Sequence, residues 1–120
     1  MAKSFNIPEI YTSLEEMLED ENVQVIDIAI PVEAQYDVVR QAAQHGKHIL
    51  CQKPLAPNYS EGKKIVEICE KAGVLMAVNQ QMRWSPSIHA CKDLIDRKLL
   101  GDLVQIAIQV NVNIDWSNWE

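Results

Sequence analysis

Residues 48–54, His-Ile-Leu-Cys-Gln-Lys-Pro, join a short apolar run directly to a charged turn. The run from Ile49 to Cys51 predicts a buried strand, because it is brief, apolar and followed at once by polar residues. Lys53 therefore comes at the carboxyl end of a strand, which is where open α/β sheets bind ligands. Pro54 restricts the backbone just after the charge. A solvated surface lysine in a loop is the alternative, since the tripeptide Gln52-Lys53-Pro54 alone indicates only a candidate functional site.

Strand-like and helix-like segments alternate on both sides of this run, which predicts βαβ units and a parallel sheet. The clearest strand is Val23–Ile30, whose nearly continuous apolar and β-branched residues are typical of strands covered on both faces. A further strand is expected at residues 74–78. Helices are expected at residues 13–20, 34–45 and 60–72, and a last helix from Ser85-Pro86 to near Gly101.

The helix ends carry their own signals. Ser13 and Glu16 have the spacing of a capping box, in which side chains satisfy the free amides of a first turn. Gly46 and Gly73 follow two of the expected helices, where glycine readily takes the left-handed terminal conformation. These signals predict helix boundaries independently of the apolar periodicity.

From Leu103 the pattern changes to a period-two alternation, in which Gln105, Gln109, Asn111 and Asn113 are the polar members. The apolar members are Val104, Ile106, Ile108, Val110, Val112 and Ile114. Period-two alternation predicts an antiparallel strand with one wet face. We therefore expect a boundary between residues 1–101 and residues 102–120, and we interpret the second stretch as the opening strand of a truncated domain.

Composition excludes several classes of protein. Of the 120 residues 48% are apolar and the net charge is −6, so a nucleic-acid partner is not expected, because phosphate binding needs a basic surface. No stretch approaches the roughly 18 apolar residues of a membrane span, and no secretory leader is recognisable, so no membrane partner is expected. The three widely spaced cysteines predict free buried thiols and a reducing cytoplasmic location. No histidine has metal-ligand spacing, so no metal site is expected.

The order of segments resembles the Gfo/Idh/MocA group of glucose–fructose oxidoreductase, inositol dehydrogenase and their sugar-dehydrogenase relatives. The resemblance covers nearly the whole chain, and it depends on the order and spacing of several individually weak pieces. Those pieces are Asn6–Pro8, Tyr11–Leu18, Val25–Pro31, His45–Ala56, Asn79–Pro86 and Leu100–Leu103.

This resemblance implies an NAD- or NADP-binding Rossmann domain followed by an open antiparallel sheet, with hydride transfer at a hydroxyl carbon of a sugar or polyol. The catalytic role of the family's lysine falls on Lys53, whose ammonium would stabilise a developing alkoxide and position the small-molecule substrate. The residues implied to line the nicotinamide side of the cofactor are Pro31, Gln35, Gln52, Lys53, Pro54, Asn79, Gln80 and Arg83.

Three departures from the family pattern qualify that implication. Gln52 stands where the family has glutamate, so Lys53 would lose a counter-ion. Val32 and Gln35 stand where the family often has asparagine and histidine. No G-x-G-x-x-G occurs in the 120 residues, so the turn that cradles the pyrophosphate is absent and weak or no cofactor binding is expected of this chain.

The resemblance therefore indicates an α/β fragment. Residues 1–101 would be the C-terminal half of a Rossmann domain, a partial parallel sheet with flanking helices. Residues 102–120 would be the first strand of an α+β antiparallel-sheet domain. In the strand order 3-2-1-4-5-6, Val23–Ile30 is the fourth strand and leaves an apolar edge open, so we expect homo-oligomers through exposed strand edges.

Two other interpretations stay open from the sequence. A non-enzymatic α/β assembly or regulatory module would explain why Val32, Gln35 and Gln52 each replace a family contact. A receiver-type domain is less well supported, because it needs acidic residues at strand ends to hold Mg²⁺. Asp27 is the acidic residue found in a predicted strand, and it lies inside that strand.

Overall fold

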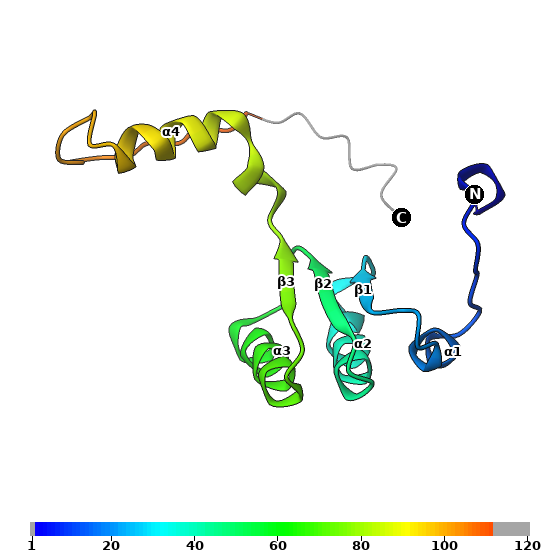
Figure 1. Cartoon of the computed structure of the whole chain (residues 1–120). Helices are drawn as coiled ribbons and strands as arrows, with labels where there is room; N and C mark the ends of the chain where they lie inside the picture. The colour runs from blue at the N-terminus through cyan, green and yellow to red at the C-terminus, as the bar shows by residue number, and fades with distance from the viewer. Residues whose placement is uncertain (1, 112–120) are drawn as a thin grey trace. The chain divides into compact units, whose positions relative to one another are not determined.

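The computed structural model describes residues 2–111 of the chain, which divides into two compact units between Gln81 and Met82. Each unit is described by itself. The first unit contains a short 3₁₀ helix, η1 (Ala2–Phe5), and then helices and strands in strict alternation (Figure 1). These are α1 (Leu14–Glu19), β1 (Val25–Ile28), α2 (Val32–Gln44), β2 (His48–Gln52), α3 (Tyr59–Ala72) and β3 (Met76–Asn79).

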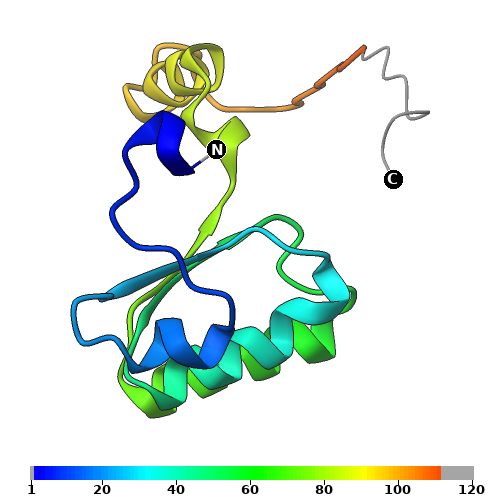
Figure 2. The same cartoon turned by 90° about the vertical axis from the view of Figure 1, so that its right-hand side faces the viewer.

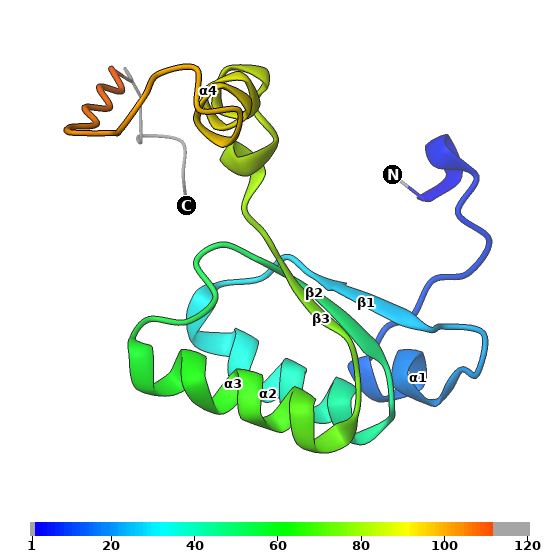
Figure 3. The same cartoon turned by 60° about the vertical axis from the view of Figure 1, so that its left-hand side comes forward.

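The three strands form one parallel sheet in the order β1-β2-β3. Helices α1, α2 and α3 all lie on the same side of this sheet (Figures 2 and 3). Parallel strands joined through helices are the βαβ arrangement that the alternation of segments predicts. The predicted fold class, a partial Rossmann-like α/β sheet with flanking helices, is therefore confirmed for the first unit.

Alternate residues of the strands enter the core. Ile26 and Ile28 of β1 are buried while Val25 and Asp27 are exposed, as expected for a period of two. The buried side chains form one cluster between the sheet and the helices, made of Leu18, Ile26, Ile28, Val39, Ala42, Ala43, Ile49, Cys51, Ile65 and Cys69. The other face of the sheet carries partly or fully exposed residues, so β1 is covered on one face where the sequence suggests two.

The helix boundaries follow their capping residues. Ser13 Oγ accepts a hydrogen bond from the backbone amide of Glu16 at 3.2 Å, and Asn58 Oδ1 accepts one from Glu61 at 3.0 Å. Gly73 ends α3 in the left-handed conformation with φ of 68°, as the sequence predicts. The side chain of Lys47 reaches back to donate to the carbonyl of Asp20 at 2.8 Å, which ties the end of α1 to the start of β2.

The 3₁₀ helix η2 (Gln81–Trp84) spans the boundary between the two units, and α4 (Pro86–Asp96) lies in the second unit. This helix ends several residues before Gly101, because Lys98 adopts a positive φ of 55°. Residues 103–111 pair with no strand in the described part of the chain, so the opening strand expected from Leu103 stays a prediction. Residues 112–114 of that prediction lie outside the described part. Cys91 is exposed and not buried, and no residue of α4 is buried among the described residues.

Across residues 2–111, the structure contains no helix with the length and apolarity that crossing a lipid bilayer requires.

Candidate functional site

Lys53 follows directly after β2, and the Lys53–Pro54 peptide bond is cis. Because the three strands are parallel, the carboxyl ends of β1 and β3 meet the end of β2 at the same edge of the sheet. The lysine side chain is exposed there. The position at the carboxyl edge of the sheet agrees with the sequence prediction, while the catalytic role remains a prediction.

A row of polar side chains crosses this end of the sheet. Gln52 Nε2 donates a hydrogen bond to Asp27 Oδ1 of β1 at 3.2 Å, and Gln52 Oε1 accepts one from Asn79 Nδ2 of β3 at 3.0 Å. Gln52 lies directly opposite Asn79 in the strand register, whereas Asp27 is opposite Leu50. The amide of Gln52 therefore links all three strands, and we call Asp27, Gln52 and Asn79 the polar ladder.

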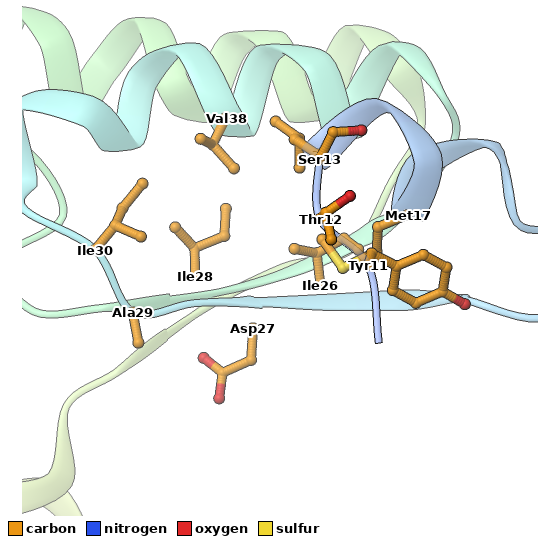
Figure 4. Close-up of a pocket in the computed structure, with 11 residues that line it drawn as sticks. Tyr11, Thr12, Ser13, Met17, Ile26, Asp27, Ile28, Ala29, Ile30 and Val38 are labelled. Carbon is orange, nitrogen blue, oxygen red and sulfur yellow. The ribbon is translucent and has the colours of Figure 1, made fainter. Parts of the chain in front are cut away.

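Sequence reasoning selected Gln52 and Asn79 but missed Asp27. One signal could have found it, since Asp27 is the charged residue in an otherwise apolar strand and falls on the opposite side from Ile26 and Ile28. Figure 4 shows its carboxylate pointing away from the side chains of Ile28 and Val38. Its place in the register brings it within reach of Gln52 on the neighbouring strand.

Gln35 of α2 holds the Lys53–Pro54 turn through a hydrogen bond. Its side chain is 1% exposed, and its Nε2 donates to the backbone carbonyl of Pro54 at 3.0 Å. Its Oε1 is buried without a hydrogen-bond partner in the described residues, which leaves an acceptor available to a small donor. Gln35 therefore lies against the Lys53–Pro54 turn from α2, and the neighbours of Lys53 on both sides are held by side chains.

The other predicted site residues are placed as follows. Pro31 is the N-cap residue of α2 and makes no side-chain capping bond. Gln80 follows β3, and its backbone amide donates to the carbonyl of Val78 at 2.9 Å. Arg83 belongs to the second unit, where it lines a hollow of about 450 Å³ together with Trp84, Ile88, His89 and Lys92. The indole of Trp84 stacks on the imidazole of His89 there, with ring centroids 5.8 Å apart.

A groove of about 340 Å³ runs along the free edge of β1, between that strand and the segment that leads into α1. Its lining is largely apolar and includes Tyr11, Met17, Ile28, Ile30 and Val38 (Figure 4). β1 pairs with β2 on one side. The backbone groups on its other side, which face this groove, have no strand partner in the described residues.

The cysteine next to the site is not suited to act as a nucleophile. Cys51 lies directly before Gln52, but burial raises the pKa of its thiol to about 11, with smaller contributions from Cys69 and Asp27. Burial also raises the pKa of Cys69. A thiol with a raised pKa is protonated at neutral pH and is a poor nucleophile. Among residues 2–111, no group of three or more His, Cys, Asp and Glu side chains could hold a metal ion.

Comparison with known proteins places this parallel sheet and its helices in a protein family. Residues 1–80 match the family described as "Oxidoreductase family, NAD-binding Rossmann fold" under the name GFO_IDH_MocA. The chain belongs to the Gfo/Idh/MocA oxidoreductase family. This membership confirms the resemblance found in the sequence, and it agrees with the parallel sheet and its helices.

Three relatives illustrate the family. The chain is 32% identical to trans-1,2-dihydrobenzene-1,2-diol dehydrogenase of Xenopus tropicalis over 94% of its own length and 34% of that protein. It is 35% identical to D-apiose dehydrogenase of Paraburkholderia graminis over 73% of its own length and 24% of that protein. An Agrobacterium radiobacter oxidoreductase solved in complex with NAD⁺, L-tartaric acid and magnesium matches with a TM-score of 0.80 and 30% identity, over 84% of this chain and 30% of that one.

The chain thus spans about a quarter to a third of the length of the curated relatives that it matches, at 34% of the Xenopus protein and 24% of the Paraburkholderia protein.

Proposed function

We propose that this chain forms the nicotinamide-side part of an NAD(P)-dependent dehydrogenase that transfers hydride at a hydroxyl carbon of a sugar or polyol. Residues 1–101 would be the C-terminal half of the cofactor domain, and residues 102–120 the opening strand of the substrate domain. The observation that carries the proposal is the position of Lys53, an exposed ammonium at the carboxyl edge of a parallel sheet in an NAD-binding family. The D-apiose dehydrogenase among the relatives supports a sugar as substrate class.

The residues at this edge fit the nicotinamide end of the cofactor. The amides of Gln52 and Asn79 and the ammonium of Lys53 are hydrogen-bonding groups of the kind that a carboxamide and a reacting hydroxyl require. The buried Oε1 of Gln35, which has no partner among residues 2–111, is a further acceptor beside the turn. No G-x-G-x-x-G occurs in the sequence, so the diphosphate has no glycine-rich cradle here. We therefore expect this chain to bind the cofactor weakly or not measurably.

In the proposed reaction the bound cofactor supplies a hydride acceptor or donor. The chain's own contribution is positional and electrostatic. Lys53 holds the substrate hydroxyl by a hydrogen bond and stabilises the negative charge that develops on its oxygen. Pro54 and the bond from Gln35 keep the lysine backbone in one place while that charge forms. The groups Pro31, Gln80 and Arg83 are proposed as further cofactor contacts.

A binding experiment tests the role of Lys53. ¹⁵N-labelled chain is titrated with NADH and, separately, with NADPH at millimolar concentrations, and the backbone amide shifts are followed by NMR. We expect shifts confined to the ends of β2 and β3, without saturation at micromolar ligand, and their loss in Lys53→Ala. Lys63→Ala is the matched control, because Lys63 is exposed on α3 and pairs with Glu67. The absence of shifts at these strand ends would count against the proposed site.

An absorbance assay tests whether this chain alone catalyses the proposed reaction. Sugars and polyols are supplied with NAD⁺ or NADP⁺, and reduced cofactor is followed over time. We expect no turnover by the 120 residues alone, since the diphosphate cradle is not among them. Micromolar cofactor binding or measurable turnover would contradict the proposal that this chain is an incomplete part of the cofactor domain.

A second candidate function has one observation in its favour. Gln35 and Gln52 both direct their amides to partners inside the protein, which suits a module whose strand ends are structural. We propose a non-enzymatic assembly or regulatory role as the alternative. It predicts that NADH and NADPH leave the amide spectrum unchanged while the chain still forms a defined oligomer.

A further inference from the structure

The polar ladder is directional, and its direction depends on the side chain at position 52. Toward β1, Gln52 presents the Nε2 donor to the carboxylate of Asp27 at 3.2 Å. Toward β3, it presents the Oε1 acceptor to the amide of Asn79 at 3.0 Å. An amide has one donor end and one acceptor end, whereas a carboxylate only accepts. Glutamine is therefore matched to a carboxylate on one side and an amide donor on the other.

We propose that Asp27, Gln52 and Asn79 are positioning residues that act as one coupled unit, fixing the end of β2 and with it the turn that presents Lys53. The unit requires complementary chemistry at positions 27 and 52, so that an aspartate at 27 demands an amide at 52. The interpretation of Lys53 as the group being positioned rests on the proposed function. The coupling between positions 27 and 52 does not, because it follows from the hydrogen bonds alone.

The position of the ladder explains why it acts on the turn. Gln52 is the last residue of β2, and Lys53 comes next. Side-chain bonds from both neighbouring strands converge on Gln52, and Gln35 holds the carbonyl of Pro54 on the other side of the lysine. The residues before and after Lys53 are thus held by groups from β1, β3 and α2. The ladder lies on the face of the sheet opposite to the helices, so it does this without contributing to the apolar core.

A double-mutant cycle tests the coupling in the 120-residue chain. Gln52→Glu places two carboxylates against each other, and we expect it to lower the folding equilibrium constant by about tenfold, since like charges facing across adjacent strands destabilise a sheet. Asp27→Asn keeps an acceptor for Gln52 and is expected to change that constant by less than about threefold. The double variant D27N/Q52E restores a complete ladder, because the asparagine amide now donates to the new carboxylate. Gln24→Glu is the matched control, because Gln24 is an exposed glutamine that directly precedes β1 and takes no part in the polar ladder.

The readouts are equilibrium unfolding in urea and NMR. In Gln52→Glu the backbone amide of Lys53 should shift, and in D27N/Q52E it should return toward its original position together with the stability. Additive effects, with the double variant as destabilised as Gln52→Glu, would overturn the proposal. If Gln52→Glu does not fold, folding of D27N/Q52E is itself the rescue, and its failure counts against the coupling.

Asp27→Ala provides an independent measurement. It removes the acceptor without adding a charge, so the side-chain amide protons of Gln52 should lose their hydrogen-bonded shift and the Lys53 amide should move. Unchanged signals would overturn the ladder. All of these measurements use no cofactor, so a ladder that is confirmed while Lys53→Ala leaves NADH shifts intact would refute the proposed function and leave the coupling standing.

Discussion

The cysteine thiols differ in their access to solvent, and this difference gives a prediction at the scale of single residues. Cys51 and Cys69 are buried and Cys91 is exposed. Because burial raises the pKa of the Cys51 thiol to about 11, it lacks both access and thiolate character. We expect a thiol reagent such as DTNB to label Cys91 rapidly in the native chain.

Cys51 and Cys69 should become reactive upon unfolding in urea. In Cys91→Ser the rapid phase should disappear and the slow phases should remain. Rapid native labelling in that variant would contradict the burial of the other thiols.

The hydrogen bond between Tyr11 and Asp20 predicts a pH dependence of stability. Tyr11 donates its hydroxyl to Asp20 Oδ2 at 2.5 Å. This bond is the main cause that lowers the pKa of Asp20 from 3.8, with help from the backbone amide of Asn22. A carboxyl group with a lowered folded pKa stabilises the fold above its unfolded pKa, and that contribution is lost as pH falls through the folded value.

As pH falls below 3.8, the free energy of unfolding of Asp20→Asn should therefore decrease less steeply than that of the wild type. Unfolding in urea across that range measures the difference. The same bond raises the pKa of Tyr11 from 10.0 to about 12, so its stabilisation should fade as pH rises between those values and should be missing in Tyr11→Phe. Parallel pH profiles for the wild type and both variants would contradict the pairing.

At the scale of secondary-structure elements, the N-caps give the sharpest prediction. Asn58→Ala removes the side-chain acceptor for the amide of Glu61 and should destabilise the first unit by about 1 kcal/mol. Ser60→Ala is the control, an exposed position in the first turn of the same helix, and should be nearly neutral. Thermal unfolding followed by circular dichroism measures both. Equal losses in the two variants would indicate that the cap bond contributes nothing.

The elements also show what could be read from the sequence and what could not. The cap at Ser13 and the left-handed turn at Gly73 were predictable, because both depend on residues close in sequence. A partner for the expected strand from Leu103 was not, because alternation describes one surface of a strand and does not specify which strand pairs with it. At the site, Lys53 could be placed from the end of an apolar run. The bond between Asp27 and Gln52 could not, because it depends on the register of two strands and joins residues 25 apart in the sequence.

At the scale of the whole molecule, the free edge of β1 predicts self-association. Val25 is 57% exposed at this edge, and an apolar groove lies alongside. Exposed strand edges pair readily with other chains, and an inserted lysine opposes such pairing. We expect sedimentation velocity to show oligomers at micromolar concentration and Val25→Lys to shift them toward monomer.

Val66→Lys is the matched control for this experiment. Val66 is 41% exposed but lies on α3, away from the strand edges, so the added charge should leave the oligomers intact. A wild-type chain that sediments as a stable monomer would remove the support for assembly through strand edges.

The placement of all three sheet-covering helices on one side has a thermodynamic consequence (Figure 3). Much of the opposite surface of the sheet is already hydrated before unfolding begins, so denaturation of this unit exposes comparatively little new area. The urea m-value and the heat-capacity increment both scale with that area. Both should be low for the number of residues, giving a broad melting transition and a stability curve that changes only slowly with temperature.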